Sequence, residues 1–280
     1  MFSRNAGQNN PPLRQTDFAV YEDGVRQDIS FFASAESPFD LVLLLDLSAS
    51  TADKIGLIKK SAVRFVDAAR PNDRIAIVTF TAEVQVIATL TSDRLALKKN
   101  IERMEKPRGG TNFWDAMRFV LEHLLGQSRA EHRRSAVVVM TDGVDNALVE
   151  IFGVGSRTTF EELMEIVRRS DSIILPIYLD TEKEANPHIN PTGAYATARR
   201  QLAMLAEESG NQVYRARKVK DLEGVYEQVI RDLSTVYSIG YRPTNTARNG
   251  SWRNVSVQLA GHSDLAVKTR RGYYPVGSRQ

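Results

Sequence analysis

Apolar and polar residues along this chain follow two periods, one typical of buried strands and the other of amphipathic helices. Residues 40–46 form an almost continuous apolar run, as in a parallel strand whose two faces are covered by helices. Apolar residues then recur every three or four positions over residues 55–69, which predicts a helix that ends before Pro71. Because strand and helix patterns keep alternating, we expect an α/β protein with a Rossmann-like, doubly wound and mostly parallel sheet.

The same two patterns place the remaining elements of this sheet between about residues 38 and 235. The predicted strands are 74–80, 84–90, 136–140, 173–179 and 212–215, and the predicted helices are 95–104, 115–125, 160–169, 194–209 and 221–235. A polar stretch at 180–192 contains Pro187 and Pro191, so we expect a loop there.

Both ends of the chain have a different pattern, with short β segments and no helical period. Asp23-Gly24 is a hairpin signal between strand-like runs, and Asn249-Gly250 marks a turn between two further runs. The strand-like runs lie within residues 18–32, 236–241, 253–260 and 265–270. We expect the two ends to combine into a small antiparallel sheet. The expected segments are a flexible leader (1–15), a β hairpin (16–36), the α/β domain (37–235), further β strands (236–275) and a tail (276–280).

The composition favours an ordinary soluble globular protein and argues against several classes of site. Apolar residues make up 42% of the chain and charged residues 25%, which is ordinary for a soluble globular protein. The net charge is only +3 with both signs interspersed, which argues against a nucleic-acid surface. The chain has no cysteine, which excludes disulfides, thiolate zinc sites and cysteine nucleophiles. The sequence has no apolar run long enough to span a membrane, and residues 1–15 lack the apolar core of a signal peptide.

Three short fragments supply oxygen ligands at predicted strand ends or rim loops. Asp46, Ser48 and Ser50 follow the first buried strand, Thr111 ends a Gly-Gly-Thr loop, and Asp142 follows the strand at 136–140. Each fragment alone also fits a helix cap or an ordinary loop. Together they bring two carboxylates and three hydroxyls to one edge of the sheet, which suits a hard divalent cation. We expect Mg²⁺, with Mn²⁺ as the alternative and Ca²⁺ less favoured.

These five residues resemble the metal-ion-dependent adhesion site (MIDAS) of the von Willebrand factor type A (VWA) domain. The resemblance covers about residues 38–235 and implies that Asp46, both serines, Thr111 and Asp142 bind magnesium or manganese, directly or through water. It also implies that an acidic group of a protein partner, an Asp or Glu carboxylate, completes the coordination of the metal.

The two ends of the chain resemble the corresponding ends of a bacterial group, the VWFA-related proteins first described in acidobacteria. The similar segments are residues 17–24 and 29–32 before the domain and residues 265–274 after it. In that group a longer β-rich stretch usually precedes the match. The resemblance implies an extracytoplasmic location, periplasmic or secreted.

Residues beside the expected metal site are candidates for contact with a partner. Asn112, Phe113 and Trp114 follow Thr111 directly, and exposed aromatic side chains often anchor interfaces. The alternative for Trp114 is packing beneath the loop, because tryptophan is highly buried on average. Asp145 lies close enough to Asp142 to shape the rim.

The favoured hypothesis is a non-enzymatic protein-binding module with an adhesion or scaffold role. The alternative is a metal-dependent hydrolase or phosphoryl-transfer enzyme at the same rim, for which Asp145 is the nearby candidate base. In a third possibility the metal site is structural and the β extension binds the partner.

Other chemistry finds little support in the sequence. The four histidines (His123, His132, His188 and His262) have no ligand-like spacing, and the chain has no Gly-x-Ser-x-Gly nucleophile motif. The basic cluster at 129–134 lies between a predicted helix and a predicted strand, so we expect it in a solvated loop.

Overall fold

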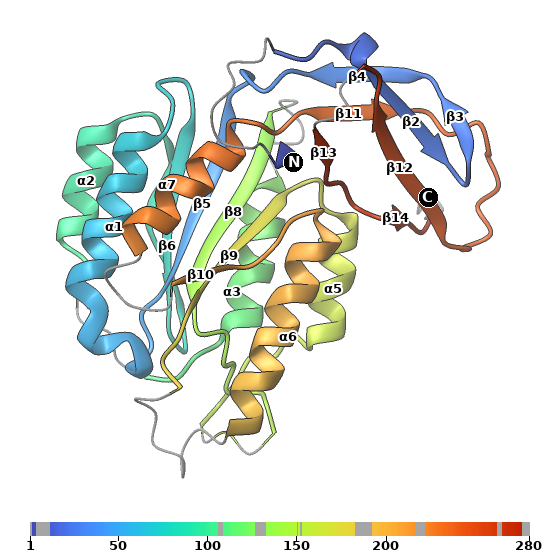
Figure 1. The fold of residues 1–280 in the computed structure, drawn as a ribbon. Coiled ribbons are helices and arrows are strands. Elements are labelled where there is room, and N and C mark those ends of the chain that lie inside the picture. The colour runs from blue at the N-terminus through green and yellow to red at the C-terminus, as the bar shows by residue number, and fades with distance from the viewer. Residues whose placement is uncertain are drawn as a thin grey trace. The chain divides into compact units, whose positions relative to one another are not determined.

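The alternating strand and helix pattern folds into a six-stranded sheet flanked by helices (Figure 1). The computed structural model describes residues 2–3, 12–105, 109–126, 133–149, 151, 153–182, 192–216, 222–261 and 265–275. The chain divides into two compact units, one formed by Pro38–Ile230 and the other by Met1–Ser37 together with Arg231–Gln280. We refer to them as the α/β unit and the terminal unit.

The sheet of the α/β unit is parallel except for one edge strand. Its strands are β5 (Phe39–Asp46), β6 (Arg74–Phe80), β7 (Val84–Thr91), β8 (Arg134–Thr141), β9 (Ile173–Leu179) and β10 (Tyr214–Ala216). Their order across the sheet is β10-β9-β8-β5-β6-β7, and only the β6–β7 pair is antiparallel. The doubly wound, mostly parallel sheet expected from the sequence is therefore confirmed.

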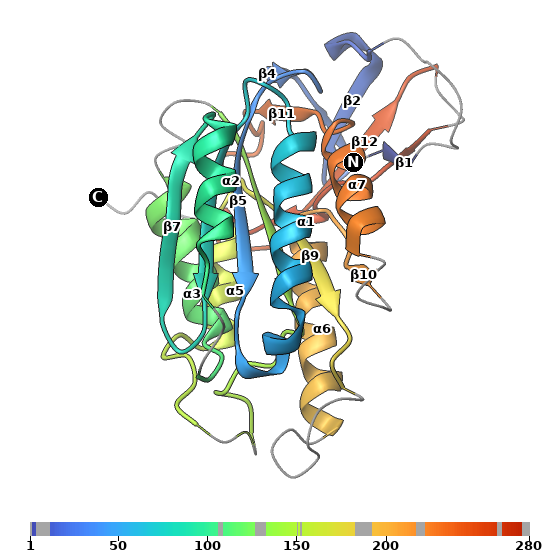
Figure 2. The same cartoon turned by 90° about the vertical axis from the view of Figure 1, so that its left-hand side faces the viewer.

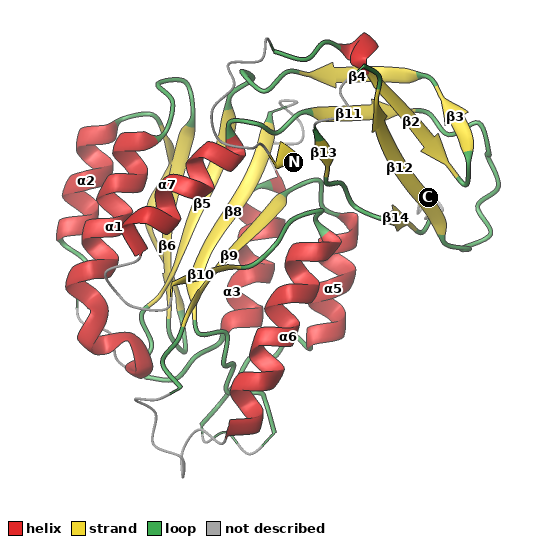
Figure 3. Cartoon of the chain, in the orientation of Figure 1, coloured by secondary structure: helices red, strands yellow, loops and turns green. Residues whose placement is uncertain are grey.

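Helices cover both faces of this sheet (Figures 2 and 3). They are α1 (Ile55–Ala68), α2 (Arg94–Glu102), α3 (Phe113–Phe119), α5 (Phe160–Arg169), α6 (Thr192–Glu208) and α7 (Leu222–Leu233). Side chains of β5 alternate between the two faces, so Val42 and Leu44 pack in one buried cluster with α3, α5 and α6. On the other face, the Phe65 ring of α1 meets the Tyr226 ring of α7, and the Tyr226 hydroxyl donates to the Met140 sulfur.

β5 lies at the point in the sheet where the strand order reverses: the strands that follow it in sequence, β6 and β7, lie on one side, and the later strands β8, β9 and β10 lie on the other. It pairs with β6 on one side and with β8 on the other. The segments that follow β5 and β8 lead to helices on opposite faces of the sheet (Figure 1). Such a switch point opens a crevice at the carboxyl ends of the two strands, which is the usual ligand position in open α/β sheets.

Several element ends differ from the sequence-based expectation. The helix expected at 115–125 begins at Phe113 and continues beyond α3 as a π-helix, Val120–Leu124. The expected loop at 180–192 falls largely outside the described residues, as do His132, His188 and His262, whereas His123 is exposed.

The basic cluster at 129–134 ends inside the fold rather than in a solvated loop. Asp40 is fully buried, and its carboxylate accepts from Arg133 at 2.7 Å and from Arg74 at 2.6 Å. Arg134 is also buried and lies over the Phe39 ring, 3.9 Å from its centroid, and burial lowers the pKa of this arginine to about 10. The expectation of a solvated loop was wrong for these two arginines, because Arg133 pairs with the buried Asp40 carboxylate and Arg134 stacks on the Phe39 ring.

The terminal unit is antiparallel and joins strands from both ends of the chain, as expected. Its strands are β1 (Phe2–Ser3), β2 (Phe18–Glu22), β3 (Val25–Gln27), β4 (Ile29–Ala33), β11 (Ser238–Tyr241), β12 (Arg253–Leu259), β13 (Ala266–Val267) and β14 (Gly272–Tyr273). A 3₁₀ turn, Gln15–Asp17, precedes β2. Four of the strands form a sheet in the order β14-β12-β2-β3, β4 pairs with β11, and β1 pairs with β13. Asp23 and Gly24 have positive φ angles of 48° and 81°, so the expected hairpin turn is present.

Three details of this unit go beyond the sequence-based expectation or differ from it. β11 and β12 flank the Asn249-Gly250 turn, yet each pairs with an N-terminal strand, β4 and β2 respectively. The strand expected at 265–270 is only two residues long, Ala266–Val267. Part of the expected leader is also structured, since Phe2–Ser3 pairs with β13 and Leu13 is buried.

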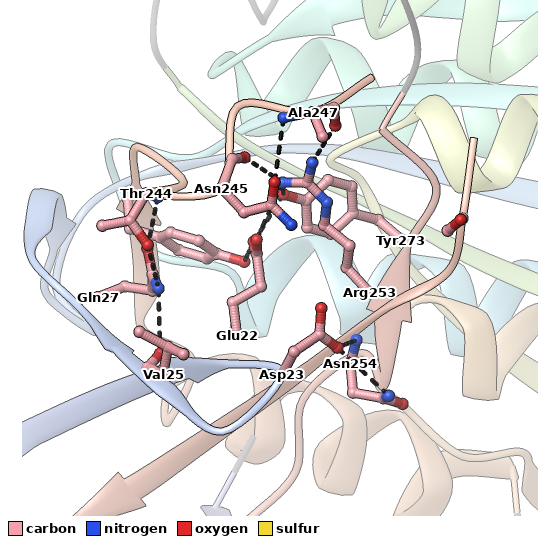
Figure 4. Close-up of polar contacts among 12 residues, drawn as sticks. Glu22, Asp23, Val25, Gln27, Thr244, Asn245, Ala247, Arg253, Asn254 and Tyr273 are labelled. Carbon is pink, nitrogen blue, oxygen red and sulfur yellow. Dashed lines mark hydrogen bonds and ion pairs between the residues drawn. The ribbon is translucent and has the colours of Figure 1, made fainter. Parts of the chain in front are cut away.

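A buried polar network links the two ends of the chain within this unit (Figure 4). The Glu22 carboxylate pairs with Arg253 at 2.9 Å and accepts hydrogen bonds from the Tyr241 and Tyr273 hydroxyls, both at 2.7 Å. Arg253 also donates to the Asn245 carbonyl at 2.6 Å. Burial, and then the hydrogen bond to Glu22, raises the pKa of Tyr241. Both charges are thus compensated, as buried charges must be.

Candidate metal site

Asp46 is the last residue of β5, and its carboxylate is fixed by two donors from different segments. Its Oδ1 accepts from the backbone N–H of Ser48 at 2.9 Å, and its Oδ2 accepts from the Thr141 hydroxyl at 2.6 Å. Thr141 ends β8, the neighbour of β5 in the sheet. The carboxylate is therefore held at the switch point between the two strands.

The two serines connect this corner to the second carboxylate. The Ser48 and Ser50 hydroxyl oxygens lie 3.1 Å apart, and the Ser50 hydroxyl donates to Asp142 Oδ2 at 2.7 Å. The backbone N–H of Val144 donates to Asp142 Oδ1 at 3.1 Å. Ser48 and Asp142 are buried whereas Ser50 is half-buried, so the cluster reaches the solvent on the Ser50 side.

Thr111 lies on a loop that is tied to both neighbouring rim loops. Its N–H donates to Asn146 Oδ1 at 3.1 Å, and its carbonyl accepts from the Asn146 N–H at 2.9 Å. The next residue, Asn112, donates its N–H to the Thr81 carbonyl at 2.8 Å. A Cβ at Gly110 would lie 2.5 Å from the Asn146 side-chain amide, so a side chain here would displace that amide.

The structure thus places all five expected ligands at one rim. Asp46, Ser48, Ser50 and Asp142 form a connected cluster, and Thr111 lies on the loop that contacts the segment after Asp142. Within the part of the chain that the structure describes, no group of three or more His, Cys, Asp or Glu side chains is placed to hold a metal. Any cation here would be held by two carboxylates and neutral hydroxyls.

Electrostatics show why the two carboxylates suit a cation. Burial, and then the negative charge of Asp142, raises the pKa of Asp46 to about 7, although hydrogen bonds from Ser48 and Thr141 act in the opposite direction. Burial likewise raises the pKa of Asp142, against hydrogen bonds from Ser50, Thr181 and Val144 and the charge of Lys54. A divalent cation would offset both buried charges, and the all-oxygen donor set fits Mg²⁺ or Mn²⁺.

The aromatic residues expected to contact a partner are buried instead. The exposed fraction is 1% for Phe113 and 6% for Trp114. The Phe113 ring lies 5.9 Å from the Phe80 ring, and the Trp114 ring lies 6.0 Å from the Phe160 ring. The expected partner contact is therefore wrong for these two side chains, because the first turn of α3 packs against the sheet. Asn112 is half-buried, and its partner contact stays a prediction.

Asp145 also has an internal role rather than a place on the exposed rim. It is 0% exposed, and both carboxylate oxygens accept hydrogen bonds. Oδ1 accepts from the N–H groups of Ala147 and Ser156, and Oδ2 accepts from the Trp114 N–H and the Ser156 hydroxyl. These bonds fix the loop after Asp142 to the start of α3, so the expected direct partner contact is wrong for this residue as well.

Two residues that the sequence analysis gave no role take part in the site. Thr141 donates to Asp46, and Thr181 donates to Asp142 Oδ2 at 2.8 Å. Thr181 follows β9 by two residues and so reaches the same rim as Asp142. Its position after a predicted buried strand is a usable signal, although the polar pattern of residues 180–192 by itself predicts only a loop.

The fold and the site define a class: a Rossmann-like domain with an oxygen-rich cluster at the switch point of its sheet. Residues 40–228 match the von Willebrand factor type A domain family, and the chain belongs to that family. The sequence resemblance is confirmed at the level of the family.

Solved structures share this fold at low sequence identity. A von Willebrand factor type A protein from Catenulispora acidiphila is 16% identical with a TM-score of 0.54, and the match covers 80% of this chain and 52% of that chain. Proximal thread matrix protein 1 from the mussel byssus, with a zinc-occupied MIDAS motif, is 18% identical with a TM-score of 0.55, covering 74% and 48%. The present chain thus spans about half the length of each.

A third structure matches over nearly its whole length. The vWF domain of the type V pili tip protein Mfa5 from Porphyromonas gingivalis is 14% identical with a TM-score of 0.53, and the match covers 75% of this chain and 98% of that domain. At these identities the likeness concerns the fold alone.

Proposed function

We propose that the α/β domain, residues 37–235, binds a divalent cation and uses it to capture an acidic group of a protein partner. The ligands would be Asp46, Ser48, Ser50, Thr111 and Asp142, and the cation Mg²⁺ or Mn²⁺. The observation that supports this most is the pair of buried carboxylates, Asp46 and Asp142, both with raised pKa values and both accepting hydrogen bonds from the serine segment, Asp46 from the Ser48 N–H and Asp142 from the Ser50 hydroxyl. Two buried anions at a switch point call for a positive charge.

The solvent-facing side of the cluster favours binding of an external group. Ser50 is half-buried, so a cation held there would keep a position open towards the solvent. Magnesium usually retains water beside one or two protein carboxylates, and an incoming Asp or Glu side chain can replace such a water. The bound metal would act as the electrophile for that carboxylate.

The relatives support an adhesion or scaffold role outside the cytoplasm. One has a zinc-occupied MIDAS motif, and another is the domain of a pilus tip protein. Among the helices that the structure describes, none is long and apolar enough to cross a membrane. We propose that strands from residues 16–36 and 236–275 form an accessory module of this extracytoplasmic binding protein.

The first test is metal binding followed by capture of a partner. Calorimetric titration with Mg²⁺ or Mn²⁺ should show binding by the wild type and little or none by Asp142→Asn, which keeps the shape but removes a charge. Partner capture from native cell-envelope extract should require Mg²⁺ and disappear with excess chelator. Asp67→Asn is the matched control, because its carboxylate is 53% exposed and pairs only with surface Lys98 among the ion pairs described. Equal capture with and without chelator would contradict the proposal.

We further propose that the rim has no enzymatic role. Asp145, the base considered from the sequence, has both carboxylate oxygens engaged by four donors, so its lone pairs are occupied. A panel of phosphate esters and peptides, assayed with Mg²⁺ and Mn²⁺, should give no turnover. Metal-dependent turnover that Asp46→Ala abolishes would show the opposite.

A further inference from the structure

We propose that Thr181 and Tyr195 are positioning residues for the Asp142 carboxylate, so that helix α6 takes part in setting the metal affinity of the rim. This inference rests on the proposed function, because it concerns the same metal site. It assigns a role to two buried residues that are not themselves expected ligands.

A chain of hydroxyl groups runs from α6 to the carboxylate. Thr181 is 1% exposed, and its hydroxyl lies 2.8 Å from Asp142 Oδ2. The Tyr195 hydroxyl lies 3.2 Å from the Thr181 hydroxyl, and Tyr195 is 0% exposed. A threonine hydroxyl has one hydrogen, and an ionised carboxylate only accepts. When Asp142 is ionised, Thr181 therefore donates to Asp142, and Tyr195 donates to Thr181.

These contacts fix the plane of the carboxylate independently of the other expected ligands. Val144 donates its backbone N–H to Oδ1, and Thr181 donates to Oδ2. Ser50 also donates to Oδ2, but Ser50 is an expected ligand whose contacts would change when a cation binds. Thr181 can keep its bond in both states. Such outer partners orient a ligand and raise metal affinity.

Apolar packing joins α6 to the same loop. Tyr195 lies in a buried cluster with Val144, Ala194 and Ala198. Gly143, between Asp142 and Val144, lies so close to α6 that an added Cβ would be 2.8 Å from the Leu202 side chain. A shift of α6 would therefore move both the hydroxyl chain and the loop that carries Asp142. By reciprocity, cation binding should alter the surroundings of Tyr195.

The test compares the Mg²⁺ and Mn²⁺ affinities of three single variants and one double variant by calorimetry. Thr181→Val removes the donor at nearly constant volume and should weaken binding about 10–100-fold. Thr181→Ser keeps the hydroxyl and should bind within about threefold of the wild type. Tyr195→Phe should cause a smaller loss than Thr181→Val, and the double variant Thr181→Val/Tyr195→Phe should be no weaker than Thr181→Val alone, because both act through one chain.

Thr158→Val is the matched control. Thr158 is a buried threonine whose side chain bonds to Asp115, so this substitution also removes a Thr–Asp hydrogen bond. It should change the melting temperature in chelator without changing metal affinity. This comparison separates a positioning role from a general loss of stability.

The outcomes distinguish this inference from the proposed function. Wild-type metal binding together with unchanged affinity in Thr181→Val would overturn the inference alone. Equal losses in Thr181→Ser and Thr181→Val would also overturn it, because the hydroxyl would then not be the cause. A wild type that binds metal no better than Asp46→Ala would overturn both proposals.

Discussion

At the scale of single residues, the rim holds two acidic side chains in surroundings that disfavour their charge. Asp46 and Asp142 are both buried, and each raises the electrostatic cost of ionising the other. Hydrogen bonds from Thr141, Ser48 and Ser50 reduce this cost only in part. In the absence of a cation, the site should therefore oppose folding at neutral pH.

The metal-free protein should accordingly lose stability as the pH rises from about 4 to 7. The pKa of Asp46 is 3.8 in the reference state and about 7 in the folded protein, so the folded chain binds more protons across this window. The free energy of unfolding then decreases with rising pH. Melting in chelator should show a decrease of roughly 5 °C between pH 5 and pH 8, once other groups are accounted for.

Asp46→Asn is the control for this effect, since an amide cannot ionise. The variant should be more stable than the wild type at pH 8 in chelator, and the difference should shrink as the pH falls towards about 4. Adding Mg²⁺ should raise the melting temperature of the wild type alone at pH 8, because a ligand stabilises the state that binds it. A wild type and variant with parallel pH profiles would refute this assignment.

At the scale of elements, the turn after β8 requires a residue with positive φ and no side chain. Gly143 has a φ of 76°, and a Cβ there would meet Leu202 of α6 at 2.8 Å. Gly143→Ala should destabilise the protein by more than about 1 kcal/mol, through backbone strain together with a steric clash. It should also weaken metal binding, because the turn carries Asp142. Thermal melting and calorimetric titration measure the two effects.

Gly56 in α1 is the matched control for glycine replacement. It lies in a helix, and an added Cβ would find no atom within 4 Å. Gly56→Ala should stabilise the protein by about 0.5–1 kcal/mol, because alanine has the higher helix propensity. A stabilising Gly143→Ala would show that the turn tolerates a side chain.

At the scale of the whole molecule, the ends of the chain are joined by strand pairing and by one buried ion pair. β2 pairs with β12, and Glu22 binds Arg253 and two tyrosine hydroxyls. Glu22→Gln should lower the melting temperature by roughly 5 °C or more, because Arg253 would remain buried without its counter-charge. Glu36→Gln, on an exposed residue of the same unit, should have little effect. Similar melting of both variants would assign the network no stabilising role.

The terminal unit also shows where local patterns fail as a guide. The Asn249-Gly250 signal marks the connection between β11 and β12, but it does not tell which strands these two pair with. Which strands pair over a long sequence separation depends on how all the apolar faces of the folded unit are covered, and no local pattern contains that information.

The side chains of Phe113 and Trp114, in the α/β unit, are a second case in which a local pattern is not enough. From the sequence they could lie on the rim or beneath it, and only the packing of α3 against the sheet decided for burial.

The sequence by itself determined the strand and helix order along the chain, the edge of the sheet at which the parallel strands end and the residue types gathered there. It could do so because burial on both faces imposes a continuous apolar run on β5 and β8, and because parallel strands end at one rim. Only the tertiary structure decided which side chains are exposed, that Asp145 is fully hydrogen-bonded, and that Thr181 and Tyr195 reach Asp142. Those contacts join separate segments of the chain, so their geometry depends on how helices pack against the sheet and has no local period to reveal it.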